Sequence, residues 1–140
     1  AFEYVSVEEA MRRGGLRMVV VGGVPSPWGE AAKGITVAQV VPNPWARKLA
    51  IAREYQDAAR KADPKADFSY GALEGYLTAK ALGMSLQATG RDLNRANWLR
   101  TMSNARFDLG GLVIQYKPGQ HDGSHFVDLS MVDRDGRFLQ

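Results

Sequence analysis

The chain has 140 residues, of which 45% are hydrophobic and 24% charged, a composition typical of a folded globular domain rather than a disordered segment. It contains no cysteine, which excludes disulfides and thiolate chemistry, and the net charge of +3 comes from scattered basic residues, which disfavours nucleic-acid binding. No apolar run approaches the roughly 18 residues of a transmembrane helix. Residues 1–10, AFEYVSVEEA, lack the pattern of a signal peptide.

The first part of the chain predicts strands around one short helix. Residues 1–5 suit a strand, and Ser6 suits the N-cap of the helix that follows. The apolar runs LRMVVV (16–21) and ITVAQVV (35–41) are typical of strands buried on both faces. Glycines and prolines keep the intervening GGVPSPWGE (22–30) irregular. This order predicts an α/β fold with a mostly parallel sheet.

The middle of the chain predicts three helices. Apolar residues recur near a 3.6-residue period over 45–61, and the next helix is expected over 69–82, ending at a glycine. The last helix is expected over 91–103, with Thr89 as its candidate cap. The strands that open the chain offer too little sheet for these helices to cover.

The C-terminal part predicts strands again. GGLVIQY (110–116) and HFVDLSMV (125–132) suit two strands, followed by a turn at DRDG and a last short strand. Histidines 121 and 125 lie four residues apart, a spacing that suits a metal site on a helix, but PGQHDGSH is too rich in glycine to be helical. The interpretation favoured over a metal site is a polar hairpin, with Gly123 at positive φ. We therefore expect no metal and no cofactor.

Three stretches together resemble a known family. They are VAQVVPNPW (37–45), FSYGALEGYLTAKAL (68–82) and DLGGLVIQYKPGQHDGSHFVDLSMVDRDGRF (108–138). The chain resembles the type I periplasmic substrate-binding proteins of ABC transporters, most of all the receptors for branched-chain amino acids. The shared features are a strand leading into proline-x-proline, a glycine–tyrosine pair within a long helix, an aspartate before two glycines, and a final hairpin.

The resemblance covers about residues 35–140 and corresponds to the C-terminal half of the family fold. It implies Rossmann-like lobes, each incomplete here because the N-terminal half is missing. Residues 1–44 would be the later part of the second lobe, residues 45–108 a helical return to the first lobe, and residues 109–140 a C-terminal β-hairpin that crosses back.

The function implied by the resemblance is solute binding. The intact protein would trap a small amino acid or organic acid between its lobes in the periplasm and deliver it to a membrane permease. The other expected partners are the N-terminal half of the same protein and, through exposed apolar helix faces, further copies of the chain. An alternative is a ligand-sensing regulator with the same fold. No enzyme is expected, since neither paired carboxylates nor a G-x-S-x-G elbow occurs.

The ligand is expected at two places. One is the loop after the strand at 16–21, because ligands of α/β sheets gather at the carboxyl ends of strands. The other is the start of the helix at 69–82, where relatives present an aromatic side chain. The alternatives are that the loop is only a connector and that the aromatic residues at the helix start only pack in the core. The residues concerned are Gly22, Gly23, Val24 and Ser26 in the loop, and Phe68 and Tyr70 at the helix. The family's acidic or polar residue for the ligand's amino group is matched by Gly22 or Gly23.

Overall fold

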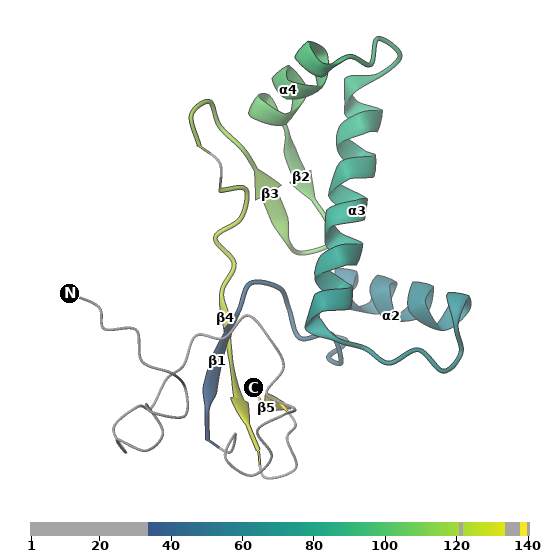
Figure 1. Cartoon of the computed structure of the whole chain (residues 1–140), viewed down its shortest axis with the longest axis vertical. Coiled ribbons are helices and arrows are strands. Elements are labelled where there is room, and N and C mark those ends of the chain that lie inside the picture. Colours follow the sequence, from purple (N-terminus) through teal and green to yellow (C-terminus); the bar gives the residue numbers. More distant parts are fainter. Residues whose placement is uncertain (1–33, 121, 134–137, 140) are drawn as a thin grey trace, which may run out of the picture. The chain divides into compact units, whose positions relative to one another are not determined.

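The computed structural model describes residues 34–120, 122–133 and 138–139. Two compact units make up the chain, and each is described by itself: residues 40–127 form one, and the described residues on either side of them belong to the other. In Figure 1, α2, α3, α4, β2 and β3 belong to the first of these units, and β1, β4 and β5 to the second. The elements predicted within residues 1–30 lie outside the described part.

The strands of the smaller described unit form one antiparallel sheet. Its members are β1 (Thr36–Gln39), β4 (Asp128–Val132) and β5 (Phe138–Leu139), in the order β1-β4-β5. The predicted last hairpin is confirmed here, because β4 pairs with β5. The turn predicted within that hairpin lies outside the described residues.

Side chains of this sheet alternate between buried and exposed positions. Val37, Ser130 and Val132 are buried, whereas Leu129 and Met131 are about half exposed. Val37 is paired with Ser130 across the two strands. Because successive side chains of a strand point to opposite faces, the buried residues mark the packed face of β4.

Two details of the predicted sheet differ from the structure. The strand expected over 35–41 is shorter, and its described neighbour β4 is antiparallel rather than parallel. The strands expected over 110–116 and 125–132 do not pair with each other, since β3 pairs with β2 and β4 with β1 and β5. Every strand pair in the described part of the chain is antiparallel, so parallel pairing would have to involve other residues.

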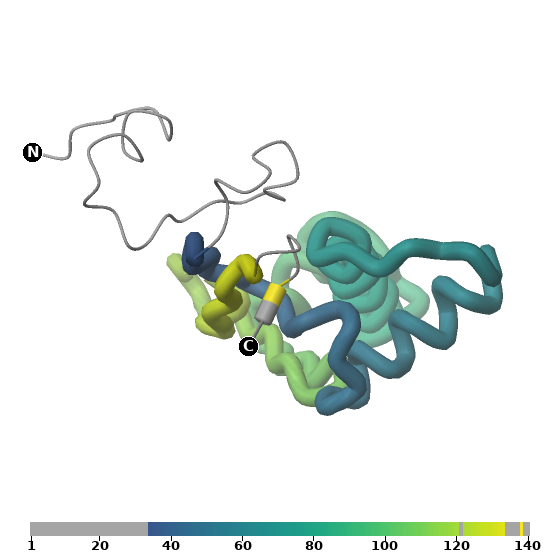
Figure 2. Tube along the Cα trace, turned by 90° about the horizontal axis from the view of Figure 1, so that it is seen from below, coloured from purple at the N-terminus to yellow at the C-terminus, as the bar shows by residue number. Residues whose placement is uncertain are grey.

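The larger unit is built around one long helix. It contains α2 (Ala50–Ala62), α3 (Tyr70–Thr89) and α4 (Arg95–Asn104), followed by the antiparallel strands β2 (Arg106–Asp108) and β3 (Val113–Gln115). Figure 2 looks along α3, and α2 runs across it close to its first turn, while Figure 1 shows α4 and the β2–β3 pair alongside it. Among the described helices, none combines the length and the apolarity needed to cross a membrane.

The predicted start of the first helix at Trp45 is wrong, and a side chain explains the difference. Oδ1 of Asn43 accepts the backbone N–H groups of Trp45, at 2.9 Å, and of Ala46, at 3.3 Å. This Asx turn offers the backbone an alternative to the helical hydrogen bonds. The helix therefore begins only at Ala50.

The ends of the other two helices are set by local polar residues and a glycine. Ser69 caps α3 as the predicted boundary implies, its Oγ accepting a backbone N–H at 3.1 Å. The helix continues through Gly83 and stops at Gly90, whose φ of 79° an L side chain rarely adopts. Asn94, not Thr89, caps α4.

The Asp-Leu-Gly-Gly sequence after β2 forms a tight loop against the start of α2. Oδ1 of Asp108 accepts the backbone N–H groups of Gly110, at 2.9 Å, and of Gly111, at 2.8 Å. The N-cap residue of α2, Leu49, has no capping side chain, and the carbonyl of Gly110 instead accepts the N–H of Ile51 at 3.0 Å. One otherwise unpaired N–H of the helix start is thereby satisfied.

The Asp108 loop makes stability depend on pH. Hydrogen bonds from the N–H groups of Gly111 and Gly110 lower the pKa of the Asp108 carboxyl below its ordinary value. The stabilisation is therefore present above the unfolded pKa, about 3.9, and is lost as the pH falls through the folded pKa. In Asp108→Asn, which cannot titrate, we expect the deficit in unfolding free energy at about pH 6 to shrink towards pH 3. Urea unfolding measures this, and a deficit that is constant with pH would contradict it.

Backbone hydrogen bonds close a turn between Gln115 and Gly123, although the strands expected on either side of it do not pair with each other. The N–H of Gln115 donates to the carbonyl of Gly123 at 2.8 Å, and the N–H of Gln120 donates to Lys117 at 2.9 Å. Positive φ occurs at Gly119, with a value of 75°, and not at Gly123 as predicted. A positive φ therefore does not explain why position 123 is glycine.

Candidate functional site

Two of the predicted ligand-binding residues, Phe68 and Tyr70, lie in the described part of the chain, at the start of α3. Phe68 is half-buried and Tyr70 is buried. The remaining predicted residues lie outside the described part: Gly22, Gly23, Val24 and Ser26.

The rings of Phe68 and Tyr70 take part in packing within the larger unit. The centroid of the Tyr70 ring lies 5.5 Å from that of Trp45, in an edge-to-face arrangement. The Phe68 ring lies 5.6 Å from that of Tyr55, and the guanidinium of Arg60 lies 4.9 Å from its centroid. The structure thus shows the packing contacts that the sequence left as an alternative, and a ligand contact at either ring stays a prediction.

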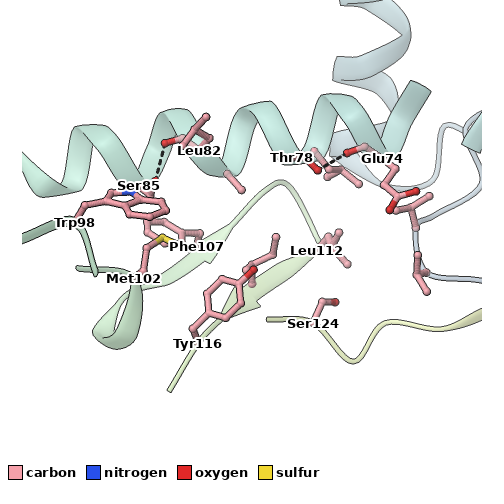
Figure 3. A pocket seen from close by; sticks show the side chains of 15 residues that line it. Glu74, Thr78, Leu82, Ser85, Trp98, Met102, Phe107, Leu112, Tyr116 and Ser124 are labelled. Carbon is pink, nitrogen blue, oxygen red and sulfur yellow. Dashed lines mark hydrogen bonds between the residues drawn. The ribbon is translucent and has the colours of Figure 1, made fainter. Parts of the chain in front are cut away.

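A pocket of about 410 Å³ lies beside α3 in this unit. Figure 3 shows Glu74, Thr78 and Leu82 of α3 along one side of it and Leu112 and Tyr116 on the other. Its lining is mainly apolar and comes from α3, α4, β2, β3 and the segments around them: Val40, Val41, Leu77, Ala81, Trp98, Met102, Phe107 and Ile114.

Polar groups in the wall of the pocket are largely bonded to the wall itself. The hydroxyl of Ser85 donates to the carbonyl of Leu82 at 2.7 Å and accepts from Nε1 of Trp98 at 2.9 Å. The hydroxyl of Thr78 donates to the carbonyl of Glu74 at 2.9 Å (Figure 3). These two hydroxyls therefore donate to groups of the wall itself, and most of the lining residues are apolar.

Gly123 is explained by the side chain of Tyr116. A Cβ atom at position 123 would lie 2.6 Å from Cζ of the Tyr116 ring, closer than any real contact. Glycine therefore lets the ring lie against the backbone, where Tyr116 lines the pocket. The sequence assigned this glycine to a turn, because the ring contact is not visible in the local pattern.

A polar network that the sequence did not predict joins α2, α3 and the loop after β2. Nζ of Lys80 donates to Oε2 of Glu54 and, at 3.0 Å, to the carbonyl of Leu109, while the hydroxyl of Tyr76 donates to Oε1 of Glu54 at 2.8 Å. The hydrogen bond from Lys80 lowers the pKa of Glu54. Partial burial and the bond to Glu54 raise the pKa of Tyr76. The network ties three segments together and supplies no open acid–base pair.

Of the two histidines considered as metal ligands, the structure describes His125. His125 is exposed in a segment without regular structure, and His121 lies outside the described residues. Among the described residues, no group of three or more His, Asp or Glu side chains is placed to hold a metal ion. The expectation that this segment binds no metal remains a prediction.

We expect no zinc binding, so zinc should leave the melting temperature of the protein unchanged. An ion that bound the folded state would raise the melting temperature by mass action. Differential scanning calorimetry of the protein with and without excess zinc checks this. An increase with zinc that disappears in both His121→Ala and His125→Ala would contradict the hairpin interpretation.

No protein-family model and no curated protein sequence matches the chain. Solved structures do match it. An extracellular ligand-binding receptor from Verminephrobacter eiseniae is 29% identical, with a TM-score of 0.68 over 79% of this chain and 32% of that one. A possible leucine/isoleucine/valine-binding protein from Rhodopirellula baltica is 28% identical, with a TM-score of 0.71 over 83% of this chain and 32% of that one.

A substrate-binding periplasmic protein from Ralstonia solanacearum is 25% identical, with a TM-score of 0.77 over 96% of this chain and 41% of that one. The chain shares the fold of the type I periplasmic binding proteins over part of their length. The fold class predicted from the sequence is therefore confirmed. The chain spans less than half the length of each of these three structures.

The descriptions of the matched structures name receptors and binding proteins. One of them is described as extracellular and another as periplasmic. The pocket beside α3 and the Lys80 network were not predicted from the sequence. Both are made by residues far apart along the chain, and no local signal would have revealed them.

Proposed function

We propose that the protein containing this chain is the extracytoplasmic solute-binding component of an ABC transporter. The observation that supports this most is the match to three binding proteins at 25–29% identity, each described as a receptor or a substrate-binding protein. Its partners would be a small polar solute and a membrane permease, and the rest of the protein would complete the fold. Hinge closure of two lobes around the solute would signal occupancy to the permease.

The two compact units support an assignment to different lobes. We propose that residues 40–127 belong to one lobe and that the flanking residues belong to the other. The boundaries would then lie near residues 40 and 127, rather than at 44 and 108 as the sequence predicted. Proline–asparagine–proline at 42–44 comes directly after the first of these boundaries.

Solute binding is tested by a thermal-shift screen of the full-length protein against amino acids, organic acids and amides. One class of solute should raise the melting temperature in a saturable way, because binding to the folded state alone stabilises it by RT ln(1 + [L]/Kd). Correctly folded protein that responds to none of these solutes would count against the proposal.

The ligand class rests on one position. The family resemblance implies an acidic or polar residue for the amino group of the ligand at a position where this chain has Gly22 or Gly23. Burying an ammonium group without a partner is costly. We therefore expect 4-methylpentanoate, which is leucine without its amine, to bind at least about tenfold more tightly than leucine, about 1.4 kcal/mol. Competition binding measures the ratio, and tight leucine binding that persists in Gly23→Trp would contradict it.

The second candidate is a sensor of the same fold, in which binding changes an interface between copies. Light scattering separates the two, since a sensor would change its oligomeric state with solute, whereas a transport receptor would stimulate uptake by its permease without such a change. Exposed apolar residues on α3 keep this alternative open.

A further inference from the structure

The segment around α4 carries the net positive charge of the chain. Residues 91–106 contain four arginines and a single acidic residue, Asp92. This stretch therefore has the same net charge as the whole chain, +3, because acidic and basic residues are equal in number over the rest. All four arginines of the stretch are exposed: Arg91, Arg95, Arg100 and Arg106.

Helix α4 has an inner and an outer face. Trp98 and Met102 of the inner face line the pocket beside α3, and Nε1 of Trp98 donates to the hydroxyl of Ser85 on α3 at 2.9 Å. Figure 1 shows α4 alongside the second half of α3. What we call the outer face of α4 consists of four exposed residues that fall within an arc of about 140° at 3.6 residues per turn: Arg95, Ala96, Leu99 and Arg100.

The cations of this segment have no acidic partner in the described structure. Among the described residues, none of Arg91, Arg95 and Arg100 forms an ion pair. The carboxylate of Asp92, the only acidic residue of the stretch, instead accepts the side-chain amide of Asn97 at 2.7 Å. These three positive charges are therefore not neutralised by the part of the chain that the structure describes.

Two leucines lie among the arginines. Leu99 lies between Arg95 and Arg100 on the outer face and exposes 46% of its surface, and Leu93, just before the helix, exposes 53%. Unpaired charges are too costly to bury against an apolar segment, so an apolar layer of a protein does not suit this face. Exposed leucines, in turn, add little to a purely ionic contact. A membrane interface suits both kinds of group, because its phosphates lie over the ends of the acyl chains.

We propose that the outer face of α4, together with Arg91 and Leu93 beside it, binds the anionic headgroups of a membrane surface. The guanidinium groups bond to lipid phosphates, and their stems lie along the interface. Leu93 and Leu99 enter the layer beneath the phosphates. The inference goes beyond solute binding and uses the proposed function only to place the protein beside the membrane that holds its permease.

Sedimentation of the full-length protein with vesicles tests the proposal. Binding to vesicles with about 30% phosphatidylglycerol should saturate and be at least about tenfold stronger than binding to pure phosphatidylcholine. It should be lost when the ionic strength rises from about 0.01 M to about 1 M, because the Debye length falls from about 30 Å to about 3 Å. No binding at low ionic strength, or equal binding to both kinds of vesicle, would overturn the proposal.

The double variant Arg95→Gln, Arg100→Gln locates the binding on α4. Each arginine at an anionic surface contributes about fivefold, which is about 1 kcal/mol, so this variant should bind roughly 25-fold more weakly. The matched control, Lys61→Gln with Lys65→Gln, removes the same charge from exposed positions around the end of α2 and should change binding by less than about twofold. Equal losses in the two double variants would show a response to net charge alone and would refute the proposal.

Leu99→Ser tests the apolar part of the contact. Vesicle binding should fall by at least about twofold, because less apolar surface enters the interface. Unchanged binding would contradict the assignment to a membrane and indicate a purely ionic contact. The thermal shift with solute should be the same in the natural protein and in these variants, so failure here can be told apart from failure of the proposed solute binding.

Discussion

Gly110→Ala should destabilise the protein by about 2–4 kcal/mol, which is the largest effect we expect from a single methyl group. Two costs add at this position. The backbone φ of 110° is a conformation that L residues rarely adopt, and the new Cβ would lie 3.0 Å from the backbone nitrogen of Ile51. Moving the loop to relieve the contact would weaken the bond that caps the start of α2.

The matched control is Gly119→Ala. Gly119 also has a positive φ, of 75°, but a Cβ there would meet nothing within 4 Å. It should therefore lose only the conformational term, about 1 kcal/mol. Urea unfolding of both variants gives the two free energies. Equal losses at the two positions would show that the contact with Ile51 does not matter.

The second large effect concerns the 140-residue chain by itself. With the exposed apolar residues Leu82 and Leu86 of α3 and the pocket uncovered, it should associate with other copies rather than remain monomeric, because exposed apolar patches of this kind drive association. Size-exclusion chromatography with light scattering measures this. A 15.4 kDa monomer that unfolds cooperatively would contradict the expectation.

Substitution of Leu82 and Leu86 by glutamine provides a control for that experiment. Both side chains lie on α3 and are partly exposed in the described structure. The double variant should associate less if these side chains are responsible. Association that is unchanged would point to another surface, such as the exposed residues Leu129 and Met131 of β4.

Local signals predicted the helices better than the strands. Ser69 marked the start of α3, because a serine before an apolar-periodic run supplies the side-chain cap that a helix start lacks. The start of α2 was missed because the Asn43 side chain competes with the helix for two backbone N–H groups. Strand β2 was missed because it is only three residues long and carries one buried residue, Phe107.

Pairing and site geometry depended on contacts that no local pattern contains. The antiparallel pairing of β1 with β4 joins positions far apart along the chain, Val37 with Ser130 for example. The pocket and the bonds of Lys80 likewise combine distant segments. Family resemblance, carried by motifs such as Asp-Leu-Gly-Gly at 108–111, supplied the fold class that the short strands alone did not.

Isothermal titration calorimetry of the full-length protein tests the central claim most directly. Titration with the solute that gives the largest thermal shift should show saturable binding to a single site per molecule, with the negative heat-capacity change expected when lobes close over a ligand and bury apolar surface. Binding that does not saturate, or no binding heat at two temperatures from a folded protein, would contradict the account of this chain as part of a solute receptor.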